Sequence, residues 1–285
     1  MNIDSHQHFW RYDSRRDGWI TDEMSLLRQD FLPDDLIPQL RANEMDGSVA
    51  VQADQSEEET AFLLELADRY SEIKGVVGWV NLSARDLPDR LEHFSRFEKL
   101  CGFRHIVQAE PDDAFLLRED FKRGIGCLSR YNFSYDILIY PKQLPAAIEL
   151  VDGFPEQRFV IDHLAKPLIR TREIISWTQQ IHTIAANLNV CCKLSGLITE
   201  VGRRNWRADD FRPYLDVVFE AFGPERLMFG SDWPVCLLAG SYRQVKELIA
   251  DYVHDLPVQQ QHQVFGPNAI SFYRLKTSNC ELVTT

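Results

Sequence analysis

The feature that most constrains the fold of this chain is a repeat in which a short apolar run is followed by a longer amphipathic run. The short runs are rich in β-branched and apolar residues, as buried strands are. Eight of them occur, and we predict β-strands at 2–6, 48–53, 75–80, 102–107, 134–140, 158–163, 190–195 and 227–232. The longer runs have apolar residues at helical spacing and predict helices, for example at 57–70, 86–99, 173–186 and 209–222.

Eight strands that are each followed by a helical run predict an α/β fold, the (β/α)8 TIM-like barrel. The length of 285 residues suits a single barrel domain that covers 1–285, with a flexible tail from about residue 276. A doubly wound open sheet is the competing fold, but no glycine-rich phosphate loop follows the first predicted strand. Residues 9–32 form an aromatic and charged insertion before a helix that we expect to begin at Pro33. We expect this insertion to cover a pocket.

The charge balance restricts the partners of the protein. Asp and Glu number 43 against 31 Lys and Arg, which gives a net charge of −12. This excess of negative charge argues against general affinity for nucleic acid or anionic membranes. The six cysteines form no CxxC pair, so we expect reduced thiols. With no leader segment and no apolar stretch of membrane-spanning length, we expect a cytoplasmic protein.

Two histidines, His6 and His8, stand one residue apart at the end of the first predicted strand. In such barrels the active site lies at the C-terminal ends of the strands. Side chains alternate along a strand, so both imidazoles share one face and can reach a single ion at about 2.0–2.1 Å. His163 and Asp232 end the sixth and eighth predicted strands at the same rim. A histidine pair alone is weak evidence, but the four together form a donor set suited to zinc or another divalent transition ion.

Further polar and aromatic residues at this rim are candidates for contact with a substrate. They are Arg104, His105 and Gln108 near the fourth strand, Lys166 after the sixth, and Trp10 after the first. Strand alternation does not allow Arg104 and His105 both to face inward, and the sequence does not decide between them. Lys166 is equally explicable as a solvated loop lysine, and Trp10 as a core residue.

Six segments of the sequence resemble the amidohydrolase-related, metal-dependent hydrolases, and more narrowly their sugar-lactone hydrolase branch. The resemblance runs from residue 1 to about 275. The occurrence of all six segments in this order is more specific than any one of them. The segments are DSHQHFW (4–10), GFRHIVQAEPD (102–112), FVIDHLAKP (159–167), CKLSGL (192–197), LMFGSDWPV (227–235) and GPNAISFYRL (266–275).

The resemblance implies a distorted (β/α)8 barrel in which His6, His8 and His163 are metal-site histidines. It also implies that Asp232 is the general base and that His163 takes part in catalysis. The fifth predicted strand ends in Ile139-Tyr140-Pro141, without the bridging lysine or glutamate of the binuclear members. We therefore expect one divalent metal ion, with zinc as the first choice, or metal-free catalysis by Asp232.

The activity implied by the resemblance is hydrolysis of a small sugar lactone, of the L-fucono- or L-rhamnonolactone type, to its aldonate. A positioned carboxylate such as Asp232 can take a proton from water and return it to the ring oxygen. A metal or the histidines can stabilise the negative charge that develops on the carbonyl oxygen. Which sugar and ring size are preferred, and whether the chain forms a homo-oligomer, are left open by the sequence.

Two other functions compete with this one. The first is a lactonase or decarboxylase for an anionic aromatic-degradation product of the pyrone-dicarboxylate type, which requires several arginines around the pocket. Only Arg104 lies at a predicted strand end, whereas Arg170, Arg172, Arg203 and Arg204 lie in or near loops. The second is a non-catalytic barrel that binds a sugar or a protein, for which we expect at least one rim residue to be missing.

Overall fold

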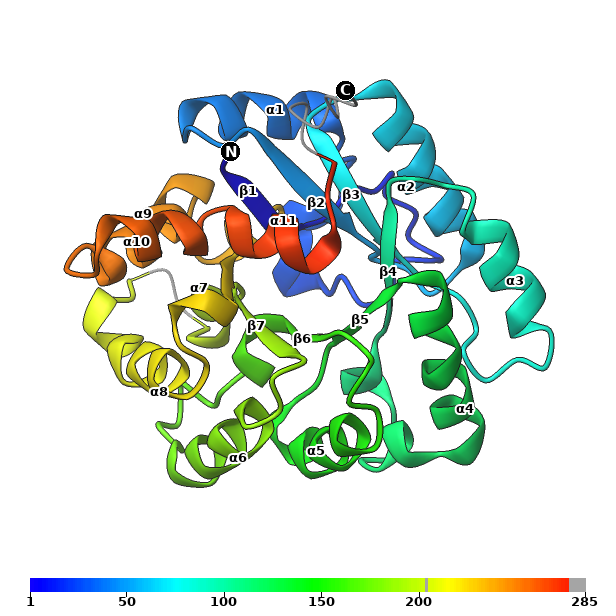
Figure 1. Ribbon diagram of the computed structural model, residues 1–285. Helices are drawn as coiled ribbons and strands as arrows, with labels where there is room; N and C mark the ends of the chain where they lie inside the picture. Colours follow the sequence, from blue (N-terminus) through cyan, green and yellow to red (C-terminus); the bar gives the residue numbers. More distant parts are fainter. Residues whose placement is uncertain (203–204, 277–285) are drawn as a thin grey trace, which may run out of the picture.

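The computed structural model describes residues 1–202 and 205–276. Eight parallel strands form one sheet in which each strand pairs with its neighbour in chain order (Figure 1). This order confirms the predicted (β/α)8 barrel and excludes the doubly wound open sheet, in which the strand order reverses. The strands are β1 (Ile3–Gln7), β2 (Gly47–Val51), β3 (Ile73–Gly78), β4 (Leu100–His105), β5 (Ser134–Ile137), β6 (Phe159–Ile161), β7 (Val190–Leu194) and β8 (Leu227–Phe229).

The barrel closes where β1 meets the segment that follows β8. The amide of Asp232 donates to the carbonyl oxygen of His6 at 2.8 Å, and the amide of His8 donates to that of Trp233 at 2.7 Å. An isolated parallel bridge joins Gln7 to Trp233, and the pairing of β1 with β2 changes register between Asp4 and Gln7. The barrel is therefore distorted at this seam, and residues of the predicted site make the closing bonds.

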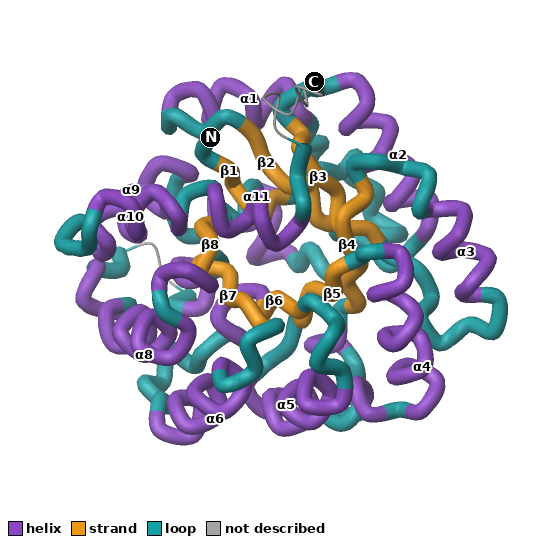
Figure 2. Tube along the Cα trace, in the orientation of Figure 1, coloured by secondary structure: helices purple, strands orange, loops and turns teal. Residues whose placement is uncertain are grey.

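Helices surround the strands as an outer layer (Figure 2). The predicted helices at 57–70, 86–99, 173–186 and 209–222 correspond to α2, α3, α6 and α8, although α3 ends several residues early. In α2, the Ser56 hydroxyl caps the first turn by accepting from the amide of Glu59. The helices are α1 (Pro33–Ala42), α2 (Glu57–Arg69), α3 (Leu87–Phe94), α4 (Glu119–Leu128), α5 (Leu144–Gly153), α6 (Ile175–Ala185), α7 (Leu197–Glu200), α8 (Arg212–Phe222), α9 (Tyr242–Val253), α10 (Val258–Val264) and α11 (Pro267–Tyr273).

The interior of the barrel changes character along the strands. Its N-terminal part is apolar, and α11 packs across it, so that the helix and the strand starts share one buried cluster (Figure 1). That cluster includes Ile3, Val49, Val77, Val160, Met228, Ala269 and Phe272. Further along, the buried residues are polar or charged: His6, Arg104, Asp136, Asp162 and Lys193. The fold thus supports a polar centre on an apolar base.

The insertion at 9–32 folds back over the C-terminal end of the barrel. Trp10 and Phe31 pair in both directions through backbone hydrogen bonds of 3.0 and 2.9 Å. The ring of Trp19 meets that of Trp10 edge-on, with centroids 5.7 Å apart. Helix α1 then begins at Pro33, as predicted.

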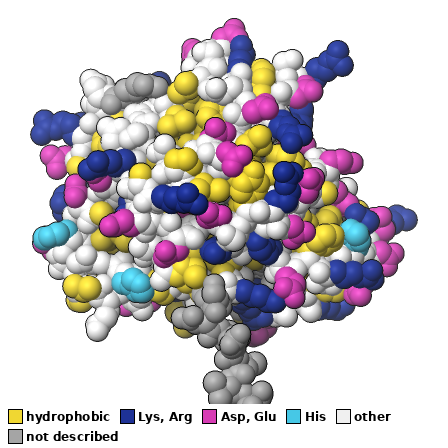
Figure 3. Space-filling view, turned by 90° about the horizontal axis from the view of Figure 1, so that it is seen from above, with side chains coloured by type: hydrophobic (Ala, Val, Ile, Leu, Met, Phe, Trp, Pro, Cys, Tyr) yellow, Lys and Arg dark blue, Asp and Glu magenta, His cyan; other side chains and the backbone are white. Residues whose placement is uncertain are grey.

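The remaining sequence expectations concern the surface, the cysteines and the tail. Lys and Arg side chains lie among Asp and Glu on the face shown in Figure 3. The described residues contain no helix long and apolar enough to cross a membrane. The five described cysteines are free thiols, while Cys280 and the tail predicted to be flexible lie outside the described residues, apart from position 276.

A close approach between α4 and the loop after β3 gives a test of this packing. A Cβ added to Gly124 would lie 2.1 Å from the backbone oxygen of Leu82. We expect Gly124→Ala to lower the free energy of unfolding by about 1–3 kcal/mol, because the helix must shift. Urea unfolding measures the change. Gly153→Ala, at the end of α5 with open space around it, is the matched control and should be neutral or slightly stabilising. Equal effects of the two substitutions would contradict this packing.

Candidate active site

A cavity of about 270 Å³ opens at the C-terminal end of the barrel. Most of the residues predicted for the site line it: His8, Trp10, Arg104, Gln108, His163, Lys166 and Asp232. Trp19 and Gln55 add to its wall. A larger hollow of about 530 Å³ beside α8 is lined by Arg170 and Arg172 and by none of the predicted site residues. The predicted site residues therefore gather at the smaller cavity, which is the candidate site.

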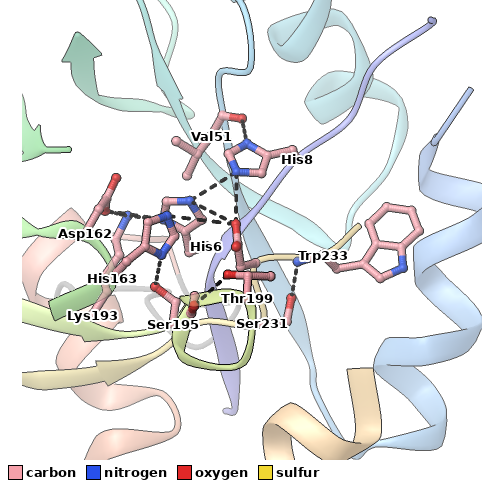
Figure 4. A network of polar contacts seen from close by, with 12 residues as sticks. His6, His8, Val51, Asp162, His163, Lys193, Ser195, Thr199, Ser231 and Trp233 are labelled. Atoms are coloured by element: carbon pink, nitrogen blue, oxygen red, sulfur yellow. Dashed lines mark hydrogen bonds and ion pairs between the residues drawn. The ribbon is translucent and has the colours of Figure 1, made fainter. Parts of the chain in front are cut away.

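The imidazoles of His6, His8 and His163 lie close together (Figure 4), and the carboxylate of Asp232 lies beside all three. His8, His163 and Asp232 line the cavity. Nε2 of His6 and Nε2 of His8 are 3.2 Å apart. Oδ1 of Asp232 lies 3.4 Å from Nε2 of His8, 3.8 Å from Nε2 of His6 and 3.9 Å from Nε2 of His163. All four side chains are nearly inaccessible to solvent. The structure thus brings together the complete histidine and aspartate set predicted from the sequence.

The outer ring nitrogens fix the orientation of two of these imidazoles. Nδ1 of His8 lies 2.7 Å from the backbone oxygen of Val51, to which it donates. Nδ1 of His163 lies 2.8 Å from the hydroxyl of Ser195 (Figure 4). Such partners fix the ring plane and the position of the ring proton. Nε2 of each ring is thereby left pointing at Asp232.

The chain after β6 adopts an unusual conformation that carries His163 into the site. Residues 163–166 all have positive φ, between 48° and 55°. Each non-glycine residue in this region costs roughly 1–2 kcal/mol. The indole of Trp177 helps to hold the turn by donating to the backbone oxygen of Leu164 at 2.9 Å. Gly196 leaves room for the ring, since a Cβ there would lie 2.6 Å from Nδ1 of His163. The turn also brings Lys166 to the wall of the cavity.

A second layer of buried charges lies beneath the imidazoles. Nη1 of Arg104 donates to Asp162 at 3.0 Å, and its other terminal nitrogen donates to the backbone oxygen of Gln52. Nζ of Lys193 lies 2.6 Å from Asp136 and 3.0 Å from Asp162. Burial raises the pKa of Asp136 to about 6 against the opposing effect of Lys193. For Asp162, burial acts to raise the pKa, but Lys193, His6 and Arg104 have the larger combined effect. The pKa of Asp162 therefore lies well below its usual value.

The protonation states of the centre follow from burial and mutual proximity. Burial lowers the pKa of His163 to about 4 and that of His6 well below its ordinary value. Burial works to raise the pKa of Asp232, but His163, His8 and His6 outweigh it, so this pKa lies below its usual range. At neutral pH, His6 and His163 are therefore neutral and Asp232 is ionised. A neutral imidazole and a carboxylate are the forms that bind a metal ion or accept a proton.

The geometry of these donors fits a divalent metal ion. His6, His8 and Asp232 each offer one atom within 4.8 Å of the others, as do His6, Asp162 and His163. Two ligands of a tetrahedral zinc ion, each about 2.0–2.1 Å from it, are about 3.3 Å apart. The Nε2 atoms of His6 and His8 are at nearly this separation. Nitrogen and oxygen donors of this kind suit zinc and related ions.

The structure separates Arg104 from His105, which the sequence left undecided. Arg104 points into the barrel and lines the cavity, whereas His105 lies outside it. The imidazole of His105 stacks on Phe115, and its Nε2 lies 2.7 Å from Glu110. Because neighbouring strand residues face opposite sides, the side chain of His105 faces the helical layer. The structure therefore does not bring His105 to the site, and it does bring Arg104.

Several residues of the site were not singled out by the sequence. Trp19 belongs to the insertion, whose path over the barrel has no periodic signal. Asp136 lies inside an apolar strand, SYDI, where a lone carboxylate is itself a signal of a buried partner. Glu200 pairs with Lys166 at 3.5 Å, so Lys166 is partnered and not simply solvated.

Trp79 and Trp233, two other tryptophans near strand ends, are not among the residues that line the cavity.

The structure is a (β/α)8 barrel with a histidine and aspartate centre at its C-terminal end, whose donors could hold a metal ion. The family model of Amidohydrolase matches residues 3–275, so the chain belongs to that family. It is an enzyme family, as the resemblance implied.

Relatives match nearly the whole chain. An L-fucono-1,5-lactonase from Burkholderia multivorans is 42% identical over 286 residues, which is 96% of each chain. An L-fucono-1,5-lactonase from Burkholderia ambifaria is 37% identical over 281 residues, again 96% of each. The crystal structure of an amidohydrolase from Burkholderia multivorans with bound zinc is 42% identical. It has a TM-score of 0.93 and covers 97% of this chain and 100% of that one.

A buried carboxyl behind the cavity wall gives a pH-dependent test. Oε1 of Glu59 accepts from the amide of Ala53, a lining residue, at 3.1 Å. Burial raises the pKa of Glu59 from 4.5 to about 7, although Ala53 and Arg16 oppose the change. The folded protein thus keeps a proton that the unfolded chain loses, so stability falls as pH rises through this window. The loss attributable to Glu59 is about 2–3 kcal/mol.

We therefore expect Glu59→Gln to stabilise the protein relative to wild type at about pH 8 and much less at about pH 5. Urea unfolding at both pH values measures the difference. Glu58→Gln, at an exposed neighbouring position, is the control and should show no such dependence. A constant difference between Glu59→Gln and wild type at the two pH values would contradict the raised pKa.

Proposed function

We propose that this protein hydrolyses a sugar-derived lactone to its aldonate, with L-fucono-1,5-lactone as the first substrate to test. Two relatives that each match 96% of the chain are named L-fucono-1,5-lactonases. The observation that carries the proposal is the convergence of three Nε2 atoms on Oδ1 of Asp232, a residue that lines the cavity.

Asp232 is the general base in this proposal. It is ionised at neutral pH, and its Oδ1 lies at the centre of the imidazoles. A water beside it adds to the acyl carbon of the lactone while Asp232 takes the proton of that water. When the tetrahedral intermediate collapses, the bond between the acyl carbon and the ring oxygen breaks. Asp232 then returns the proton to the ring oxygen, and the product is a hydroxy acid that ionises to the aldonate.

Neutral His163 is placed to stabilise the charge on the carbonyl oxygen. Its Nδ1 lies 2.8 Å from the hydroxyl of Ser195, which can donate to it and leave the ring proton on Nε2. The Nε2–H group then faces the reaction centre as a hydrogen-bond donor. The buried guanidinium of Arg104, fixed by Asp162, adds positive charge to the inner wall of the same cavity.

A divalent metal ion, which we propose to be zinc, would be held by His6, His8 and Asp232, with His163 beside it. When bound, such an ion polarises a carbonyl group and lowers the pKa of a water molecule. The related amidohydrolase with bound zinc supports this choice.

The walls of the cavity suit a polyhydroxylated ring. Trp10 and Trp19 offer aromatic faces and edges for its apolar side. Gln55, Gln108 and Lys166 offer amide and ammonium groups for its hydroxyls. A sugar lactone presents both kinds of surface, which supports it over a purely apolar ester.

The cavity lacks the several arginines that the competing pyrone-dicarboxylate substrate would require. Within the described residues, Arg104 is the one arginine that lines the cavity. Arg170 and Arg172 line the separate hollow beside α8. Arg203 and Arg204, which the sequence also offered, lie outside the described residues. The chemistry of the wall thus favours a neutral substrate.

A panel of lactones tests the function directly. We expect L-fucono-1,5-lactone and related sugar lactones to release acid at near-neutral pH, measured with a pH indicator. We expect Asp232→Asn to lower kcat by about 100-fold or more, because the amide cannot accept the proton of water. Asp255→Asn, at a fully exposed position, is the control and should act as wild type does. Full activity of Asp232→Asn would contradict the assignment of the base. Turnover of a pyrone dicarboxylate but of no sugar lactone would contradict the substrate.

Metal binding is tested without substrate. We expect the chelated protein to take up one zinc ion per chain in equilibrium dialysis, and to unfold at a higher temperature when zinc is added. His8→Gln should bind zinc at least about tenfold more weakly, since it removes a ligand. His254→Gln, at an exposed position, is the control. Equal zinc binding by His8→Gln and wild type would contradict the assigned ligands.

A further inference from the structure

An ion pair between Lys166 and Glu200 lies at one wall of the cavity. Lys166 lines the cavity, whereas Glu200, the last residue of α7 (Figure 1), is not among its lining residues. Nζ of Lys166 lies 3.5 Å from Oε1 of Glu200, and the two side chains are only 17% and 21% exposed. Glu200 is thus placed behind a lysine that a bound ligand would meet. The proposed hydrolysis assigns Glu200 no step.

The backbone and a neighbouring ring hold Lys166 in this position. Its amide donates to the backbone oxygen of His163 at 2.7 Å, and its φ of 48° belongs to the turn at 163–166. Nζ of Lys166 lies 5.5 Å from the centre of the Tyr140 ring. A cation at this distance from an aromatic face is attracted to it. Glu200 and Tyr140 therefore hold the ammonium group beside the cavity.

The charges around the cavity are balanced in pairs. Arg104 and Lys166 are the lysine and arginine residues among the described residues that line it. Arg104 donates to Asp162 at 3.0 Å, and Lys166 pairs with Glu200. Asp232 adds a further negative charge to the lining. Until a metal ion binds, the wall therefore presents no surplus of positive charge to a ligand.

The electrostatic effect of Glu200 reaches both Lys166 and the centre of the site. Burial raises the pKa of Glu200, Lys166 opposes the rise, and Asp232 adds to it. Because most of the pair is removed from solvent, counterions screen it less than they screen a surface pair. A charge that acts over this range also acts on a charged ligand in the cavity.

We propose that Glu200 acts through Lys166 as a positioning residue for specificity. It offsets the charge of Lys166, so that the cavity selects neutral sugar lactones over ligands that carry carboxylates. The identity of the neutral substrate rests on the proposed function, but the selection against anions is measured by binding alone. A second consequence concerns the aldonate product, which carries a carboxylate that its lactone lacks. A cavity without surplus positive charge binds this anion weakly and lets it leave.

The first test is the binding of 2-pyrone-4,6-dicarboxylate, a ring with two carboxylates, measured by calorimetry on chelator-treated protein. A pH of about 8 keeps Glu200 ionised in wild type. Glu200→Gln removes the negative charge but keeps an oxygen that can accept from Lys166. We expect this variant to bind the dianion about tenfold more tightly than wild type, because the charge of Lys166 is no longer offset. The sign is diagnostic, since general damage to the site would weaken binding.

Two further variants complete this test. Glu119→Gln is the matched control, because Glu119 pairs with Lys122 at 2.7 Å on α4 and neither residue lines the cavity. It removes the same charge from a similar pair and should leave binding unchanged. The double variant Glu200→Gln with Lys166→Met should lose the gain. No gain in Glu200→Gln, a gain that survives in the double variant, or an equal gain in Glu119→Gln would overturn the proposal.

The second test uses turnover and depends on the proposed function. L-Fuconate, the anionic product of L-fucono-1,5-lactone, is added as a competitive inhibitor of wild type and of Glu200→Gln. We expect the ratio of KM for the lactone to the inhibition constant of fuconate to rise about tenfold in the variant. An unchanged or lower ratio would also overturn the proposal. If wild type hydrolyses no sugar lactone, the proposed function fails, and the binding of the dicarboxylate still decides whether Glu200 selects against anions.

Discussion

The site depends on the two backbone hydrogen bonds that close the barrel. They join the amide of Asp232 to the carbonyl oxygen of His6 and the amide of His8 to that of Trp233. Each bond ties a residue of the proposed centre to the opposite side of the seam. The distance from the carboxylate of Asp232 to the imidazoles is therefore set by barrel closure and not by flexible loops. The role proposed for this carboxylate requires positioning of this accuracy.

The same arrangement has costs that the rest of the fold offsets. The turn at 163–166 holds four residues with positive φ, and charged groups are buried without access to solvent. Lys193 and Arg104 neutralise Asp136 and Asp162, and Tyr273 of α11 donates to Asp136 at 2.7 Å. An apolar cluster closed by α11 supports this layer from below. Replacing paired buried charges with apolar groups often stabilises a protein, so their presence here is better explained by the chemistry of the centre than by stability.

The sequence predicted the barrel and the four central residues because their signals are local. Apolar runs at regular spacing specify strands, and the ends of parallel strands meet at one rim, which places His6, His8, His163 and Asp232 together. The choice between Arg104 and His105 needed the register of β4, which the pattern of residues alone does not fix. The turn at 163–166 consists of residues that rarely adopt positive φ, so its sequence does not predict it. The partners of Lys193 come from segments distant in sequence, so no local pattern reveals them. The position of Trp19 depends on the path of the irregular insertion at 9–32, whose sequence has no helical or strand periodicity.

The central claim is that Asp232 activates a water molecule that attacks the acyl carbon of a lactone. The most direct measurement is hydrolysis of L-fucono-1,5-lactone in ¹⁸O-labelled water with enzyme in excess, followed by mass spectrometry of the aldonate and of the protein. The account predicts one labelled oxygen in the carboxylate after the first turnover, none in the hydroxyl released from the ring, and none in Asp232. Label in the side chain of Asp232, or in the released hydroxyl, would contradict it.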